Sequence, residues 1–435
     1  MAISPFEERY RTDMNAVFDD RSKLAKWMAV EVALAKAHAQ LGNVPKGVPE
    51  KIHEAAAKVT LARMLAIEAE IHHDLMAMVK ALTEQAGDAG KYVHLGATSY
   101  DIEDTATALM FMDAIWLLDS HMEKLGKELK RLALAHKKTV CVGRTHGQHA
   151  VPTTYGMKFA LYYQELKRGR ERLQDAKKRI AVGKMSGAVG TMATFGKDGP
   201  KIQKIVMKEL GLGEAKVTNQ VVQRDRHAEV LCALALVAAL LEKMAKEIRN
   251  LQRTEIGEVA EPFASRQVGS STMPHKRNPH KSERVCSLAR LVRANVLTAM
   301  ENIALEHERD LTNSANERAI FPESFIATDY MLLEMGRILS GLVFYPENIR
   351  RNLELTKGLI MAERVMIYLT DKRGMGRQDA HELVRTLAQE AFEGGRHLKD
   401  LLLEKKVLDR KEAAELFDYS TYIGQAEKIV DEAVG

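Results

Sequence analysis

The stretch Gly-Ser-Ser-Thr-Met-Pro-His-Lys-Arg-Asn-Pro at 269–279 holds two serine hydroxyls, an imidazole and two cations close together. Such groups transfer protons and bind anions. Gly269, Pro274 and Pro279 prevent a helix from running through this stretch. Because long helical patterns lie on both sides of it, we interpret the stretch as a catalytic loop.

Four more segments carry side chains of the same kinds, and they are Ile71–Leu75, Tyr92–Asp101, Gly143–Ala150 and Glu308–Arg318. The first falls inside a helical pattern. Its His73, and His146 of the third, stand among Thr, Ser, Asp and Arg residues at expected helix ends. This setting favours a functional role for both histidines over a role in the core or on the surface.

Metal binding is the first alternative for these histidines. His146 and His149 are three residues apart, and neither they nor His72 and His73 form the His-Glu-x-x-His pattern of a zinc helix. Adjacent helical residues point about 100° apart, so His72 and His73 cannot both face one ion unaided. The sequence therefore predicts no metal site, and we expect no other cofactor.

A nucleophilic triad is the second alternative, and Ser270 or Ser271 with a histidine and Asp101 would supply its groups. The chain has no Gly-x-Ser-x-Gly elbow, and its pattern is helical rather than α/β, which disfavours this alternative. The Gly-rich segment Gly183–Gly196 does not match a phosphate-binding P-loop. We expect it to be a loop between two long helices.

The elements that position these residues are predicted to be helices. Proline is excluded from helix interiors, and Ala, Leu, Lys, Glu, Met and Arg, which favour helices, dominate the proline-free tracts. These tracts are 50–151, 153–199, 201–261, 280–321 and 347–435. The sequence therefore predicts an all-α fold.

One tract shows an apolar seam with alternating spacings of four and three residues, formed by Val230, Leu234, Val237, Leu241, Met244, Ile248 and Leu251. It predicts a helix of about 30 residues, roughly 45 Å long. Leu231, Leu236 and Leu240 lie off the seam, so we expect burial on more than one side, inside a bundle and at a subunit interface.

We expect three regions. Residues 1–97 form an N-terminal helical domain, 98–350 a central bundle of long helices with the loop, and 351–435 a C-terminal helical domain. A chain of 435 residues is long enough for several domains.

Composition excludes several classes of protein. The net charge of +5 is spread along the chain without a dense basic block, so no nucleic-acid partner is expected. The most apolar run, Val230–Leu241, is too short to cross a membrane. Cys141, Cys232 and Cys286 form no disulfide pattern, and the first residues have no apolar core of the signal-peptide type, so a reducing cytoplasmic location is expected.

The five segments together resemble the fumarase/aspartase superfamily over essentially the whole chain. The loop Gly-Ser-Ser-x-Met-Pro-x-Lys-x-Asn-Pro is typical of that superfamily, and His-Lys-Arg-Asn-Pro within it is similar to the adenylosuccinate lyases. Gly-Arg-Thr-His-Gly, Gln-Arg-Asp-Arg-His at 223–227 and His-Glu-Arg-Asp-Leu at 307–311 resemble the same family. The histidine at position 72 departs from the family, in which Arg is common there.

The resemblance implies elimination of fumarate from a succinyl-bearing nucleotide of purine synthesis. In that reaction Ser270 is the base, His146 is the general acid, and His73 supports the acid or the leaving nucleotide. Lys276 and Asn278 hold the substrate carboxylates. The further substrate-binding residues are Arg9, Tyr10, His72, Asp74, His94, Thr98, Ser99, Gln223, Ser271, Arg309, Ser314 and Arg318.

The resemblance also implies a homotetramer whose active sites are shared between subunits. Other functions stay open at this point. They are a superfamily lyase acting on argininosuccinate, aspartate or malate, a helical scaffold without activity, and a nucleic-acid binder suggested by the pI of about 8.8.

Overall fold

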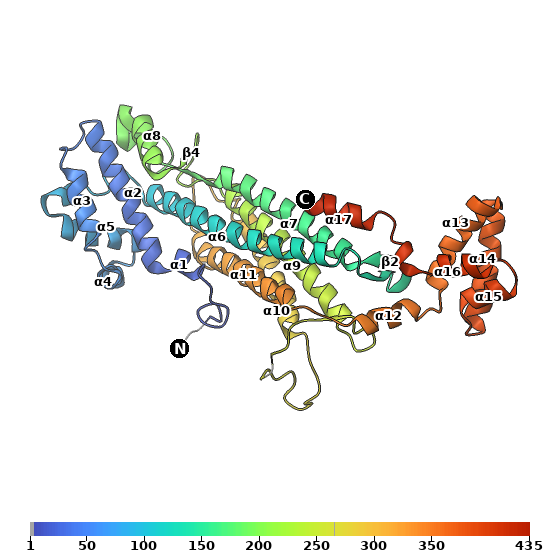
Figure 1. Ribbon diagram of the computed structural model, residues 1–435. Helices are drawn as coiled ribbons and strands as arrows, with labels where there is room; N and C mark the ends of the chain where they lie inside the picture. The colour runs from blue at the N-terminus through green and yellow to red at the C-terminus, as the bar shows by residue number, and fades with distance from the viewer. Residues whose placement is uncertain (1–3, 265) are drawn as a thin grey trace. The chain divides into compact units, whose positions relative to one another are not determined.

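The computed structural model describes residues 4–264 and 266–435, and it confirms an all-α fold (Figure 1). The α-helices are α1 Asn15–Phe18, α2 Asp20–Gln40, α3 Val48–Ala56, α4 Leu61–Ile71, α5 Asp74–Ala86, α6 Ser99–Ala135, α7 Tyr155–Ile180, α8 Gly199–Leu210, α9 Asp225–Leu251, α10 His280–Glu301, α11 Ser314–Ser340, α12 Pro346–Glu354, α13 Ala362–Arg373, α14 Arg377–Glu393, α15 Leu398–Glu404, α16 Arg410–Leu416 and α17 Ala426–Val434.

Short elements connect these helices. The 3-10 turns are η1 Gly87–Tyr92, η2 Ala193–Asp198, η3 Leu359–Met361 and η4 Tyr419–Thr421. The strands are β1 Val140–Thr145, β2 Gln148–Thr154, β3 Val182–Gly183, β4 Gly213–Glu214, β5 Val259–Ala260 and β6 Val343–Phe344. They pair as β1–β2 and β5–β6, which are antiparallel, and as β3–β4, which is parallel. The Gly-rich segment is a connection between α7 and α8, as predicted.

The chain divides into two compact units, and the division falls within α6, α7, α9, α10 and α11. The first unit comprises Met1–Met122, Gly169–Ala239 and Ser287–Leu333. In it, α2, α3, α4 and α5 lie together (blue in Figure 1). Their apolar faces share one core with α8, in which Trp27, Ile52 and Leu75 are buried.

The second unit comprises Glu123–Arg168, Leu240–Cys286 and Glu334–Gly435. Within it, α13, α14, α15 and α16 pack around a core of their own, which includes Leu369, Val384 and Leu401 (orange to red in Figure 1). A smaller apolar cluster joins Val142 of β1 to Leu353 of α12. The expected division at 97 and 350 stays a prediction.

Proline positions explain several helix starts and one difference from expectation. Pro49, Pro200 and Pro346 lie in the first turns of α3, α8 and α12, where their missing N–H would have no helical partner. Pro322, however, lies inside α11, although the proline-free tract ends at residue 321 and helix interiors usually exclude proline. The helix continues there without the backbone bond to the carbonyl of Arg318.

Burial along α9 matches the predicted seam, because all seven seam residues are at most 5 % exposed. Leu231 and Leu240 are also buried. Leu236 is 53 % exposed, so this face of the helix is not covered within a single chain.

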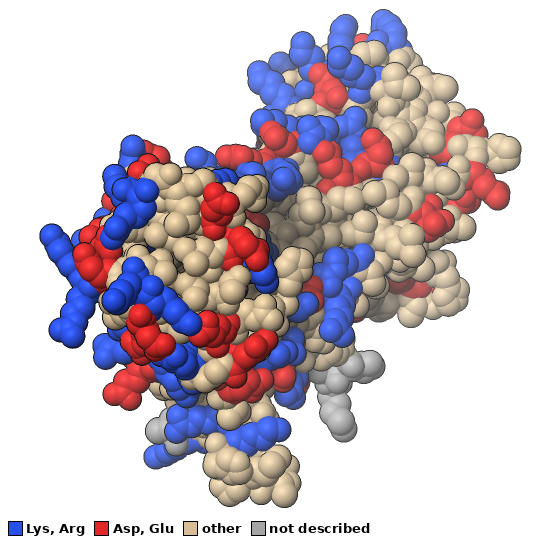
Figure 2. Space-filling model, turned by 90° about the vertical axis from the view of Figure 1, so that its right-hand side faces the viewer, with Lys and Arg blue, Asp and Glu red and all other residues tan. Residues whose placement is uncertain are grey.

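On the surface, Lys and Arg side chains are interspersed with Asp and Glu on the face shown in Figure 2. Within the described residues, no helix is long and apolar enough to span a membrane.

Candidate active site

A cavity of about 260 Å³ in the first unit collects side chains from segments far apart in the sequence. Seven of the predicted site residues line it, namely His72, His73, Asp74, Ser99, Arg309, Ser314 and Arg318. Among them, Asp74, Ser99 and Ser314 are the first residues of α5, α6 and α11. Three helix N-termini therefore meet at one cavity, and the positive ends of their helix dipoles favour a bound anion.

His72 and His73 do not lie inside a helix, so that expectation was wrong. His72 ends α4 in the left-handed conformation, with φ of 54°. His73 precedes α5, and its Nδ1 accepts a hydrogen bond from the N–H of Met76 at 3.4 Å. The break lets both rings line the same cavity, and a neutral His73 then has its donor proton on Nε2.

Two arginines supply positive charge to this cavity. Arg318 donates to Asp74 at 2.7 Å, and this pair holds the pKa of Asp74 below its usual value although burial opposes the shift. The guanidinium of Arg309 lies 3.5 Å from the ring centroid of Tyr100, and it donates to Gln220 at 2.9 Å. The buried Nε of Arg309 has no hydrogen-bond partner among the described residues. Both cations are therefore oriented before any ligand binds.

Tyr100 and Glu103, which the sequence reasoning did not select, also line this cavity. Ser99 and Glu103 are four residues apart on α6 and so share one helix face. That spacing was the available signal. Burial and the nearby charges of Asp74 and Asp104 raise the pKa of Glu103 to about 8.

His94 and Thr98 do not line the cavity but lie just before the N-terminus of α6. His94 Nδ1 is 2.7 Å from Oε1 of Glu31, and its N–H donates to Oε2 at 2.9 Å. Burial alone would lower the pKa of His94, but the hydrogen bond and charge of Glu31 raise it above the usual value. His94 is thus anchored to α2.

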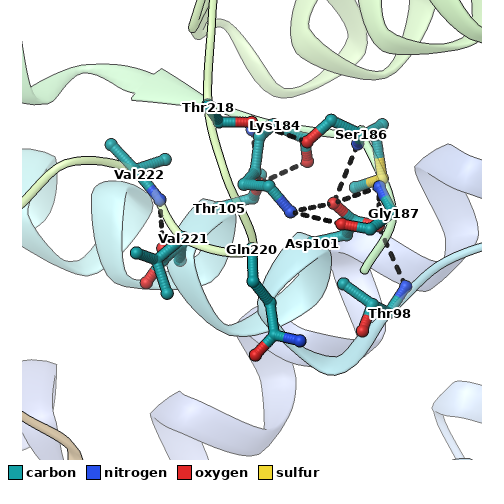
Figure 3. Close-up of polar contacts among 12 residues, drawn as sticks. Thr98, Asp101, Thr105, Lys184, Ser186, Gly187, Thr218, Gln220, Val221 and Val222 are labelled. Atoms are coloured by element: carbon teal, nitrogen blue, oxygen red, sulfur yellow. Dashed lines mark hydrogen bonds and ion pairs between the residues drawn. The ribbon is translucent and has the colours of Figure 1, made fainter. Parts of the chain in front are cut away.

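The start of α6 is held by a buried ion pair between Asp101 and Lys184, both completely buried (Figure 3). The Asp101 carboxylate also accepts from the N–H groups of Thr98 at 2.9 Å, Ser186 at 2.9 Å and Gly187 at 3.1 Å. These bonds tie the Gly-rich segment to the helix that presents Ser99. They also engage both carboxylate oxygens of Asp101, so this residue is not available to orient a histidine in a nucleophilic triad.

We predict that Lys184→Met destabilises the protein by about 3–5 kcal/mol, because the Asp101 carboxylate is left buried without its cation. Unfolding in denaturant, monitored by circular dichroism, measures the change. The matched control is Lys197→Met, which removes an exposed lysine of η2. Equal stabilities of the two variants would contradict the role of the ion pair.

Besides His94 and Thr98, three more of the predicted substrate-binding residues of the first unit do not line the cavity. Arg9 is exposed, and the ring of Tyr10 packs edge-on against Tyr330 with centroids 5.1 Å apart. Gln223 donates to the carbonyl of Val221 at 3.2 Å. Their assignment stays a prediction.

The loop that contains Ser270 belongs to the second unit. Ser270 Oγ accepts hydrogen bonds from the N–H groups of Met273 at 3.0 Å and Thr272 at 3.3 Å. Two N–H dipoles directed at one oxygen stabilise negative charge on it. Ser271 is exposed beside it, with its hydroxyl 3.5 Å from that of Thr272.

The two ends of this loop are held together. Asn278 Nδ2 donates to the carbonyl of Gly269 at 2.9 Å, and a Cβ at Gly269 would lie 2.1 Å from the Lys276 carbonyl. Only glycine allows this approach. Lys276 and Asn278 line a cavity of about 940 Å³ in the second unit, and its cations, which also include Lys246, Arg249, Arg253 and Arg277, outnumber its carboxylates, Glu261 and Glu283. The cavity suits a negatively charged ligand.

His146 lies at the tip of a β-hairpin, and not at a helix end as expected. The pairing of Thr145 with Gln148 leaves His146 and Gly147 as a two-residue turn, with φ of 54° and 74°. Positive φ at both positions is typical of a type I′ turn, which matches the twist of the strands. The side chain of His146 is exposed, and no hydrogen bond joins it to Ser270 in the described structure.

A buried carboxylate anchors the hairpin. Glu258 accepts hydrogen bonds from Arg144 of β1, from Tyr155 and, at 2.8 Å, from Asn352 of α12. Burial would raise the pKa of Glu258, but these donors hold it below its usual value. Arg144 therefore has a structural role two residues from His146.

The structure thus brings most of the predicted residues into three places: the cavity of the first unit, the Ser270 loop with its cationic cavity, and the exposed hairpin tip. Among the described residues, no cluster of three His, Cys, Asp or Glu side chains is arranged to hold a metal ion.

Comparisons with known proteins give a consistent result. The profile of a family described as Lyase matches residues 8–294, and that of the Adenylosuccinate lyase C-terminus matches residues 358–433. Adenylosuccinate lyase of Pyrococcus abyssi is 55 % identical to this chain, and the match covers 100 % of this chain and 98 % of the relative. Adenylosuccinate lyase of Methanocaldococcus jannaschii is 50 % identical, and the match covers 100 % of this chain and 96 % of the relative. The crystal structure of 3-carboxy-cis,cis-muconate lactonizing enzyme from Pseudomonas putida is 35 % identical, with a TM-score of 0.91 over 99 % of this chain and 98 % of that one.

Proposed function

Because the chain belongs to the adenylosuccinate lyase family, we propose that it cleaves adenylosuccinate to AMP and fumarate, and SAICAR to AICAR and fumarate. The observation that carries this proposal is the cavity of the first unit. Two arginines and three helix N-termini meet there, which fits a nucleotide phosphate.

In the proposed mechanism, Ser270 removes the proton from the β-carbon of the succinyl group. The resulting negative charge spreads into the neighbouring carboxylate, which Lys276 and Asn278 hold. A serine hydroxyl is a weak base, and the N–H groups of Thr272 and Met273 stabilise its ionised form. The cationic cavity beside the loop supports the same step.

The carbon–nitrogen bond then breaks, fumarate leaves, and His146 protonates the leaving nitrogen. An exposed imidazole at a hairpin tip is accessible to a bound substrate, and a general acid contributes about 10²–10⁴-fold to the rate. His73 supports the leaving nucleotide through its Nε2–H. The residues proposed to bind the nucleotide half are Arg9, Tyr10, His72, Asp74, His94, Thr98, Ser99, Gln223, Ser271, Arg309, Ser314 and Arg318.

We further propose a homotetramer in the cytoplasm, with active sites shared between subunits. Exposed apolar side chains support assembly, because Trp116 of α6, Leu236 of α9 and Leu297 of α10 are 69 %, 53 % and 67 % exposed in a single chain. A subunit interface along these long helices would cover such side chains. A cytoplasmic location is consistent with three free cysteines.

The purified protein is expected to release one fumarate per adenylosuccinate consumed, measured by separating AMP and fumarate chromatographically. The same assay with argininosuccinate, aspartate and malate tests the specificity. A folded tetramer that releases no fumarate from adenylosuccinate or SAICAR would contradict the proposal.

A further inference from the structure

Glu103 is an unusual residue for an anion site, because it adds a carboxyl to a cavity whose arginines and helix ends attract negative charge. It lies on the wall between this outer cavity and an inner one of about 290 Å³, and Tyr100, Ser314 and Arg318 form the same wall. Its side chain is half-buried and therefore only partly solvated.

The two carboxylates whose charges act on Glu103, Asp74 and Asp104, are each bound to a cation, whereas no cation among the described residues pairs with Glu103. Asp74 accepts from Arg318 at 2.7 Å, and Asp104 accepts from Arg224 at 2.9 Å. No hydrogen bond or ion pair joins the Glu103 side chain to another residue in the described parts of the chain. An ionised Glu103 would thus lie unpaired beside a bound anion, at a high electrostatic cost.

We propose that Glu103 couples anion binding in the outer cavity to proton uptake: its carboxyl is protonated when the nucleotide's phosphate is bound, and its ionisation weakens the binding. This inference rests on the proposed nucleotide function. A protonated Glu103 carboxyl can donate a hydrogen bond to the bound anion, whereas an ionised one would repel it. The affinity for the anion therefore depends on pH through Glu103.

Electrostatics support the proposal. Burial, together with the charges of Asp74 and Asp104, raises the pKa of Glu103 to about 8, against the opposing charges of Arg318 and Arg309. A phosphate carries most of its second negative charge above pH 7 and raises the pKa of Glu103 further. Anion binding and protonation of Glu103 are thermodynamically linked. The affinity for the anion must therefore fall as the pH rises and the free protein loses this proton.

Other charged and titratable groups face the same space. Around the outer cavity they are Glu68, His72, His73, Asp74, Arg309 and Arg318, and around the inner one they are Asp20, Lys23, Asp104, Arg224 and Glu317. Tyr100 lines both cavities, and burial raises its pKa far above the tested range. Gln has a shape similar to that of Glu and cannot ionise. Comparing the wild type with Glu103→Gln therefore separates the contribution of Glu103 to the pH dependence from the contributions of all these other groups.

The test is titration calorimetry of AMP with the full-length protein between pH 7 and pH 9. For the wild type, a pKa of about 8 predicts affinity about tenfold weaker at pH 9 than at pH 7. Glu103→Gln should change by less than about twofold. The control Glu70→Gln removes an exposed carboxylate from α4 and should retain the wild-type dependence.

Proton uptake gives a second measurement that needs no variant. Calorimetry in several buffers of different ionisation enthalpy gives the number of protons taken up on binding. At pH 8, the wild type should take up about half a proton per AMP bound. Sulfate, which does not titrate in this range, serves as a second probe.

The outcomes separate the two proposals. AMP binding with equal affinity at pH 7 and pH 9 and without proton uptake would overturn the coupling and leave the nucleotide function standing. Sulfate binding that weakens with pH in the wild type but not in Glu103→Gln, without any AMP binding, would support the coupling and overturn the nucleotide function. Failure of both anions to bind at any pH would overturn both.

Discussion

The Ser270→Ala variant is expected to lower kcat by about 10³-fold or more while the protein stays folded. Alanine removes the oxygen to which the N–H groups of Thr272 and Met273 point, so the proposed base is lost. The backbone of the loop should persist, because its ends are joined by Asn278 and the carbonyl of Gly269. Steady-state fumarate release measures the effect.

Thr272→Ala is the matched control for this variant. Thr272 is exposed on the same loop, and its hydroxyl lies 3.5 Å from that of Ser271. Its N–H remains after the substitution, so activity should stay near that of the wild type. Activity of Ser270→Ala within tenfold of wild type would mean that another group removes the proton.

The second large effect is expected for His146→Asn, which should lower kcat by about 10²–10⁴-fold through loss of the general acid. Asparagine is the better test than alanine, because position 146 has positive φ and Asn tolerates this conformation. The hairpin should therefore keep its type I′ turn. Unchanged unfolding, together with lost activity, would assign the effect to chemistry.

Mixing the two inactive variants tests whether sites are shared between chains. If Ser270 and His146 reach one site from different subunits, random exchange gives about a quarter of the sites both intact residues. Activity should then recover to roughly a quarter of the wild-type value. The control mixes Ser270→Ala with the double variant Ser270→Ala/His146→Asn, which cannot restore any site, and a recovery no greater than this control would rule out sharing.

Local sequence patterns predicted the elements that depend on neighbouring residues. The seam from Val230 to Leu251 predicted a long buried helix, and α9 is buried along it. Gly269, Pro274 and Pro279 predicted a loop between α9 and α10, which the structure confirms. These predictions work because helix periodicity and the backbone limits of Gly and Pro act over a few residues.

The hairpin at His146 shows what local patterns left open. Its strands carry the β-branched residues Val140, Val142 and Val151 around a His-Gly turn, which is a hairpin signal. That signal was overlooked because helix formers dominate the surrounding chain. The break between His72 and His73 carries no Gly or Pro to reveal it, so only the folded chain showed that both rings face one cavity.

The sequence by itself therefore determined the helical class, the reactive loop and the kinds of side chain at the site, because these follow from residue type and short spacing. Only the tertiary structure decided which charges meet. Lys184 pairs with Asp101 across 83 residues, and within the described parts of the chain no cation pairs with Glu103, although Arg318 lines the same cavity. Partners and burial depend on contacts between distant segments, and these set the electrostatics on which the proposed chemistry rests.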